Sequence, residues 1–176
     1  MIVGIVAAKA HSNRFPNKNI HEFQGKPLFW HSVQPLLDSE KIDEVVVSTN
    51  SDFIKSYCEE RGVKVVWRGV NASDDDEPLL GALRYAYTLL DQPYEWVVTI
   101  MANCPGHTVE TVNKAIDMAL KHEKLWEVRS FNDAGEESGL IIFKDHIIKR
   151  APQVSAYLGA VISNIKEIHY ESDLHA

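Results

Sequence analysis

Residues 1–19, MIVGIVAAKAHSNRFPNKN, contain the strongest structural signal in the chain. Ile2 to Ala8 form an apolar run of the right length for a buried strand, and too short to cross a membrane as a helix. Because the end of a buried strand holds the next loop in place, the loop's N–H groups and cations can surround an anion. Composition alone leaves two interpretations open, a polyphosphate site or an ordinary surface loop. The charged and polar side chains of this loop include Lys9, His11, Ser12, Asn13, Arg14, Lys18 and Asn19.

Composition is that of an ordinary globular protein. The 176 residues are 45% hydrophobic and 24% charged, which suits one domain with a sizeable core. The net charge of −7 argues against a nucleic-acid-binding surface, which is normally basic, but leaves room for a small anion at the first loop. Cys58 and Cys104 form no C-x-x-C pair, so they indicate neither a zinc site nor a disulfide framework. No signal peptide or membrane-spanning run is evident, and we expect a cytoplasmic protein.

Strand and helix patterns alternate through the first two-thirds of the chain. Pro35 lies inside one predicted helix and should bend it or end it early. Thr108 is a good N-cap for the last of these helices. The expected strands are 2–8, 43–49, 63–68 and 96–101, and the expected helices are 26–39, 52–61, one with its buried face at 79–90, and one from 109 to 119.

After residue 124 the pattern changes to mostly strand, with candidates at 125–131, 139–143 and 157–163. Strand–helix alternation followed by strands predicts an α/β fold with a mostly parallel sheet covered by helices. In such sheets ligands bind beyond the carboxyl ends of the strands. We therefore expect four loops to converge on one edge of the sheet, those after Ala8, Thr49, Arg68 and Met101.

The first loop also carries a recognisable family signature. Residues 6–20, VAAKAHSNRFPNKNI, resemble the N-terminal motif of the sugar-acid cytidylyltransferases, the family of acylneuraminate cytidylyltransferase. The similarity continues through GKPL at 25–28 and VVVSTNS at 45–51, and returns weakly in KEIHYESDL near the C-terminus. Its most specific part is a set of residues at fixed spacing directly after the first strand: Ser12, Arg14, Pro16 and Lys18.

This resemblance implies a Rossmann-like three-layer sandwich of the nucleotide-diphospho-sugar transferase type. It implies one domain, residues 1–176, in which residues 1–123 form nucleotide-binding βα units and residues 124–176 form strands on the acceptor and metal side. The implied reaction moves CMP from CTP to an anionic, sialic-acid-like sugar acid and releases pyrophosphate, a step in nucleotide-sugar and surface-polysaccharide biosynthesis.

The family pattern also assigns roles to individual residues. It places the catalytic cations at Lys9, Arg14 and Lys18, because nucleotidyl transfer needs positive charge along the phosphates. Lys9 stands where the family usually has Arg, so the charge is kept and the two-pronged contact is lost. The other nucleotide-binding positions implied by the resemblance are Ala8, Ala10, Ser12, Asn13, Asn19 and Arg68.

A divalent metal is the implied cofactor. Glu167 and His169 stand where the family has two metal-binding aspartates, and alternate residues on a strand share a face. Mg²⁺ is the expected ion and Mn²⁺ is the alternative, although a histidine ligand suits Mn²⁺ or Zn²⁺ better than Mg²⁺. An exposed strand edge without a metal is the competing interpretation. The acidic run at 74–77 is interpreted as a helix cap and not as a metal site.

Several departures leave the exact activity open. Ala10 and His11 replace glycines of the family motif, which alters how closely the loop backbone can approach a phosphate. Met101 and His107 stand where the family has a Gln and an Arg, so acceptor recognition cannot be transferred from the family. The alternatives are a nucleotidyltransferase for another sugar, such as an octulosonate, or an inactive nucleotide-binding protein of the same fold. The expected partners are CTP and an anionic sugar, with no nucleic acid or membrane, and a homodimer is left open.

Overall fold

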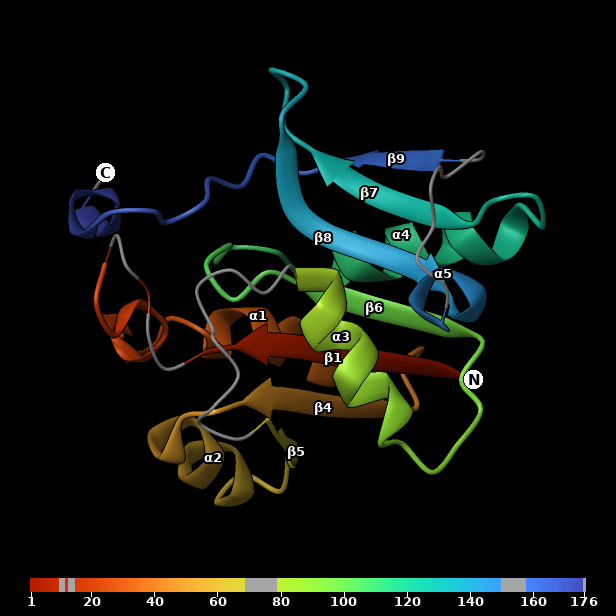
Figure 1. Ribbon diagram of the computed structural model, residues 1–176. Coiled ribbons are helices and arrows are strands. Elements are labelled where there is room, and N and C mark those ends of the chain that lie inside the picture. Colours follow the sequence, from red (N-terminus) through yellow and green to blue (C-terminus); the bar gives the residue numbers. More distant parts are fainter. Residues whose placement is uncertain (10–11, 13–14, 69–78, 150–157, 176) are drawn as a thin grey trace.

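The computed structural model of the protein describes residues 1–9, 12, 15–68, 79–149 and 158–175. A seven-stranded sheet in the order β5-β4-β1-β6-β8-β7-β9 forms its centre (Figure 1). The strands are β1 (Ile2–Ala8), β4 (Glu44–Thr49), β5 (Lys64–Trp67), β6 (Trp96–Ile100), β7 (Glu127–Phe131), β8 (Glu137–Lys144) and β9 (Leu158–Ile162).

The sheet is largely parallel, as predicted. β5, β4, β1 and β6 run parallel to one another, and β9 is parallel to β7. β8 alone reverses direction and pairs antiparallel with both β6 and β7. The carboxyl ends of β1, β5 and β6 therefore meet at one edge, the edge at which open α/β sheets bind ligands.

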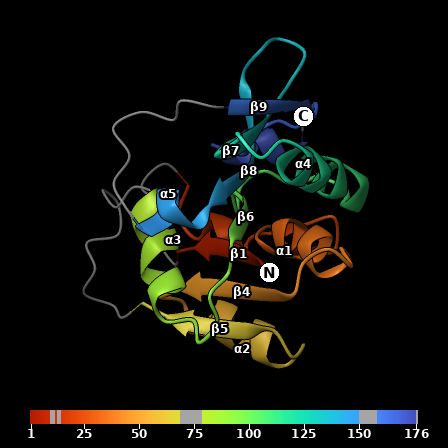
Figure 2. The same ribbon diagram turned by 90° about the vertical axis from the view of Figure 1, so that its right-hand side faces the viewer.

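Helices cover both faces of the sheet (Figure 2). α1 (Trp30–Leu37), α2 (Asp52–Glu59) and α4 (Val109–Lys121) supply buried residues to one core cluster, and α3 (Leu79–Thr88) and α5 (Asp145–Lys149) supply the other. The side chains of β1 contribute to both core clusters, one on each face of the sheet. Ile2 and Val6 lie in the first cluster, and Val3 and Ile5 lie in the second. A strand buried on both faces needs an almost continuous apolar sequence, which is what this stretch has. The expected three-layer sandwich is confirmed.

The boundaries of some elements differ from the predictions. The helix expected from residue 26 begins at Trp30, because Lys26–Pro27 form β3, which pairs with β2 (Glu22–Phe23). Gly25, with φ of 79°, makes the tight turn between these two short strands. Pro35 lies inside α1, near its end. α5 and the two 3₁₀ helices, η1 (Lys18–Ile20) and η2 (Glu171–His175), were not predicted.

Three further observations concern predictions about individual segments. Thr108 is the N-cap of α4, and its hydroxyl accepts a hydrogen bond from the N–H of Thr111, as predicted. The segment around Glu167 and His169 is not a strand, so the expected alternation of strand side chains does not apply there. Within the described part of the chain, no helix is both long enough and apolar enough to cross a membrane.

Candidate functional site

A small pocket of about 180 Å³ lies at the carboxyl edge of the parallel strands. Residues that follow β1, β5 and β6 line it, together with the start of α3. The loop after β4, which was also expected here, supplies no lining residue among those that the structure describes. The lining residues are Ala7, Lys9, Ser12, Lys18, Asn19, Arg68, Leu79, Ala82, Met101, Ala102 and Asn103.

Lys9, Lys18 and Arg68 bring three positive charges to this small space. Asn19 is buried and holds the first loop closed, since its amide donates a hydrogen bond of 3.0 Å to the Lys9 carbonyl oxygen. Positive charge confined to a pocket at this edge of the sheet is suited to an anion such as a polyphosphate.

Lys18 links the first loop to the C-terminal segment. Its ammonium donates a hydrogen bond of 3.0 Å to the carbonyl oxygen of Ile168. Asn103, which follows β6, binds the same residue twice: its carbonyl accepts from the Ile168 N–H at 2.8 Å, and its amide donates to the Ile168 carbonyl at 3.3 Å. Segments far apart in the sequence are thus tied together at the pocket.

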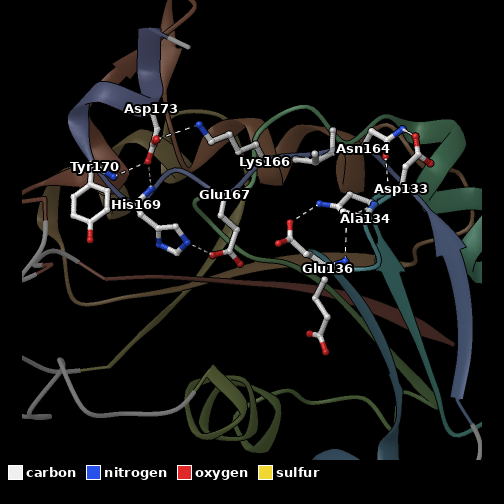
Figure 3. A pocket seen from close by; sticks show the side chains of 12 residues that line it. Asp133, Ala134, Glu136, Asn164, Lys166, Glu167, His169, Tyr170 and Asp173 are labelled. Carbon is white, nitrogen blue, oxygen red and sulfur yellow. Dashed lines mark hydrogen bonds and ion pairs between the residues drawn. The ribbon is translucent and has the colours of Figure 1, made fainter.

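Glu167 and His169 flank this anchor and contact each other. Glu167 Oε2 and His169 Nε2 are 2.8 Å apart, and Figure 3 shows the two side chains facing one another. The predicted pair therefore meets although the segment is not a strand. The Glu167 carboxylate also contacts Cys104, and burial, reinforced by this carboxylate, raises the pKa of the Cys104 thiol. Cys104 thus stays a neutral thiol.

The turn of the C-terminal segment after His169 is fixed by Asp173. Its carboxylate accepts hydrogen bonds of 2.9 Å from the N–H groups of His169 and Tyr170. These bonds, helped by Lys166 at 3.2 Å, lower the pKa of Asp173 to about 2. Asp173 thus fixes the backbone at His169 through these hydrogen bonds.

A larger groove of about 830 Å³ lies beside the Glu167–His169 pair, between the β7–β8 turn and the C-terminal segment (Figure 3). Carboxylates dominate its lining, with Lys166 and His169 as its basic groups. A triphosphate would be repelled there. Chemistry therefore favours the smaller, cationic pocket for phosphates, although the groove has the larger volume.

Some predicted site residues lie elsewhere or cannot be placed. Ala8 is buried in the core beneath α1 and α4, and its neighbour Ala7 lines the pocket instead. Ala10, Asn13 and Arg14 lie outside the described residues, as does the acidic run at 74–77.

His107, which stands where the family motif has an Arg, is buried. Its Nε2 lies 2.6 Å from the Ser138 carbonyl oxygen and its Nδ1 lies 3.1 Å from the Ser163 hydroxyl. Burial lowers the pKa of His107. The side chain joins β8 to the residue after β9, so it supports the fold.

Sequence reasoning missed several lining residues. Asn103 directly follows the end of β6, and its position at the carboxyl edge was the available signal. Leu79 and Ala82 lie on α3, and no pattern in the sequence indicated that the start of this helix would reach the pocket.

The sequence profile of the family described as "Cytidylyltransferase" matches residues 3–154, most of the chain. The chain belongs to the cytidylyltransferase family. The family that the resemblance implied is thus confirmed.

Relatives and solved structures agree with this assignment. Pseudaminic acid cytidylyltransferase from Campylobacter jejuni is 34% identical over 123 residues, which are 68% of this chain and 53% of that protein. CMP:2-keto-3-deoxy-manno-octonic acid synthetase complexed with CTP has the same fold, with a TM-score of 0.82 at 12% identity over 99% of this chain and 95% of that one. Rv0371c from Mycobacterium tuberculosis H37Rv, in complex with manganese, has a TM-score of 0.68 at 12% identity over 92% and 89% of the two chains. The chain spans about half the length of the curated relatives it matches.

Glu167 and His169 are chemically suited to a divalent cation that substrate phosphates also bind. Such ions commonly take one or two protein ligands and complete their coordination with phosphate oxygens and water. Among the described residues no group of three His, Cys, Asp or Glu side chains is arranged to hold a metal by itself. One carboxylate and one imidazole suit Mn²⁺ better than Mg²⁺.

Proposed function

We propose that the protein transfers CMP from CTP to an anionic sugar acid and releases pyrophosphate. The observation that carries the proposal is the pocket at the carboxyl edge of the sheet, where Lys9, Lys18 and Arg68 come together in a member of the cytidylyltransferase family. Three cations in a small pocket are matched to a nucleoside triphosphate, whose charge must be neutralised before a nucleophile can approach.

In the proposed reaction, an acceptor hydroxyl oxygen forms a bond with the α-phosphorus of CTP. The bond from that phosphorus to the β-phosphate oxygen breaks, pyrophosphate leaves, and the hydroxyl proton is released. Lys9 and Lys18, with Arg14 as a further proposed cation, would neutralise the phosphates, while Ser12 and Asn19 would orient them through hydrogen bonds. Arg68, which directly follows β5, would contact the nucleoside.

A divalent cation is part of the proposal. Glu167 and His169 would hold it, and the imidazole makes this pair better suited to Mn²⁺ than to Mg²⁺. When bound, the ion would supply charge neutralisation on the phosphate oxygens. The manganese complex of the structural neighbour from Mycobacterium tuberculosis supports divalent-metal use in this fold.

The acceptor is proposed only as a class. A relative named for pseudaminic acid and a structural neighbour named for an octonic acid both support a sugar acid, of the sialic-acid-like or the octulosonate type. Met101 lines the pocket where the family has a Gln, so this chain needs a different contact to the acceptor. The cytoplasmic location and a homodimer stay predictions.

The proposal is tested by pyrophosphate release. The protein is supplied with each common nucleoside triphosphate, with Mg²⁺ or Mn²⁺, and with a panel of eight- and nine-carbon sugar acids. We expect release only when CTP, a divalent cation and one of the acids are present together. CTP binding without release from any pair would contradict the transferase and favour a non-catalytic nucleotide binder.

A further inference from the structure

Ile168 lies between the two proposed metal-binding residues and is itself no ligand. Its side chain is 4% exposed and packs in a small cluster with Phe15 and Leu28, apart from the two main cores. Phe23 and Leu174 pack against the same cluster. Phe15 belongs to the first loop, so the apolar side chain of Ile168 connects the C-terminal segment directly to the cationic loop.

The backbone of Ile168 adds three hydrogen bonds to this contact. Its N–H donates to the Asn103 carbonyl at 2.8 Å, and its carbonyl accepts from the Asn103 amide at 3.3 Å and from the Lys18 ammonium at 3.0 Å. One residue thus contacts the loop after β1 and the loop after β6, the two loops that form most of the cationic pocket.

Its neighbours in the chain are not members of this cluster. Glu167 and His169 contact each other at 2.8 Å beside the acidic groove (Figure 3). Because consecutive Cα atoms are only about 3.8 Å apart, the contacts that hold Ile168 also limit where Glu167 and His169 can lie relative to Lys18. The chain from residue 163 to 170 has no strand or helix of its own to hold it.

We infer that Ile168 is a positioning residue, which sets the Glu167–His169 pair at the correct distance from the phosphates held by the first loop. The inference rests on the proposed function in taking CTP and a divalent cation as ligands. Residues that orient metal ligands without touching the metal commonly change metal affinity by 10- to 100-fold when they are altered. Ile168 would do this through packing and backbone hydrogen bonds.

The test compares two buried isoleucines of similar exposure. Ile168→Ala truncates the anchor, and Ile147→Ala is the matched control, since Ile147 is 3% exposed in the core cluster of α3 and α5. The primary measurement is the affinity for Mn²⁺ in the presence of CTP, followed by electron paramagnetic resonance of free Mn²⁺, which needs no acceptor and no turnover. The kcat and KM for CTP in pyrophosphate release form the second measurement.

We expect Ile168→Ala to weaken Mn²⁺ binding on the order of 10-fold, with a fall in kcat of similar size and a smaller change in KM. Ile168→Val, which keeps most of the apolar contact, should restore Mn²⁺ affinity, and Ile147→Ala should leave it unchanged. Leu174→Ala trims the rim of the same cluster and should give a milder loss if Ile168→Ala fails to fold.

The inference is overturned if Ile168→Ala binds Mn²⁺ as the parent does, if Ile147→Ala loses as much affinity, or if the parent with CTP binds no Mn²⁺. Failure of the proposed function looks different. If the parent binds CTP and Mn²⁺ but releases no pyrophosphate, the proposed transferase activity is ruled out. The Mn²⁺ affinities of the variants would still decide the role of Ile168.

Discussion

The buried imidazole of His107 makes the support of the C-terminal segment depend on pH. It bridges the Ser138 carbonyl and the Ser163 hydroxyl, and burial holds its pKa below the ordinary value of about 6.5. The folded protein therefore binds this proton more weakly than the unfolded chain does. By linkage, His107 makes its full contribution to the free energy of unfolding above about pH 6.5. This contribution decreases as the pH falls towards the lower pKa of the folded state.

His107→Gln should remove that part of the pH dependence. A glutamine can hydrogen-bond but does not titrate, so the variant should lose less stability than the parent between about pH 7 and about pH 5. Urea unfolding of both proteins across this interval measures the difference. Equal losses in the two proteins would show that His107 does not carry the effect.

Individual residues also show where sequence reasoning reaches its limit. Lys9, Lys18 and Arg68 could be predicted, because each lies just after a buried strand or in the loop that follows one. The contact between Lys18 and Ile168 could not, since 150 residues separate them and no periodic pattern connects them. A contact that depends on tertiary packing leaves no local pattern in the sequence from which it could be predicted.

At the scale of elements, the reversal of β8 brings the β7–β8 hairpin against the loop after β6. Gly139, near the start of β8, has φ of 89°, and its carbonyl accepts a hydrogen bond of 2.9 Å from the Met101 N–H. A Cβ atom at residue 139 would lie 2.4 Å from the Cys104 sulfur and 2.9 Å from the Cys104 Cβ. Only a residue without a side chain allows this close approach.

Gly139→Ala should therefore destabilise the protein by more than a comparable glycine substitution. Gly135 also has a positive φ, 80°, but no atom lies within 4 Å of a Cβ built there. We expect about 1 kcal/mol of destabilisation for Gly135→Ala from backbone strain alone, and at least about 2–3 kcal/mol for Gly139→Ala, where overpacking adds to it. Denaturant unfolding measures both, and similar values would mean that the contact with Cys104 is easily relieved.

The element scale also separates what the pattern predicted from what it missed. The four parallel strands were predicted because each is an apolar run bounded by a polar loop or a glycine. The start of α1 was placed too early, because the short β2–β3 hairpin has no alternation that distinguishes it from a helix start. α5 was missed because its five residues are too few for a helical period.

For the whole molecule, the alternation of strands and helices sufficed to predict a mostly parallel sheet covered by helices and the edge that carries the pocket. The division of the sequence into a nucleotide part and an acceptor part stays a prediction. The acidic groove beside Glu167 and His169 could not have been predicted, because it forms between a hairpin turn and the C-terminal segment. Its acidic lining contrasts with the cationic lining of the pocket, and under the proposed function this contrast would direct the phosphates to the pocket.

The most direct test of the account is calorimetric titration of CTP into the parent, Lys18→Ala and Lys114→Ala. Lys114 is exposed on α4 and does not line the pocket, so it serves as the matched control. We predict one site in the parent, an unchanged affinity for Lys114→Ala, and a loss of about 10- to 100-fold for Lys18→Ala, the cost of removing one charged hydrogen bond. Equal CTP affinities in all three proteins, or no binding by the parent, would contradict the assignment of this pocket to the nucleotide.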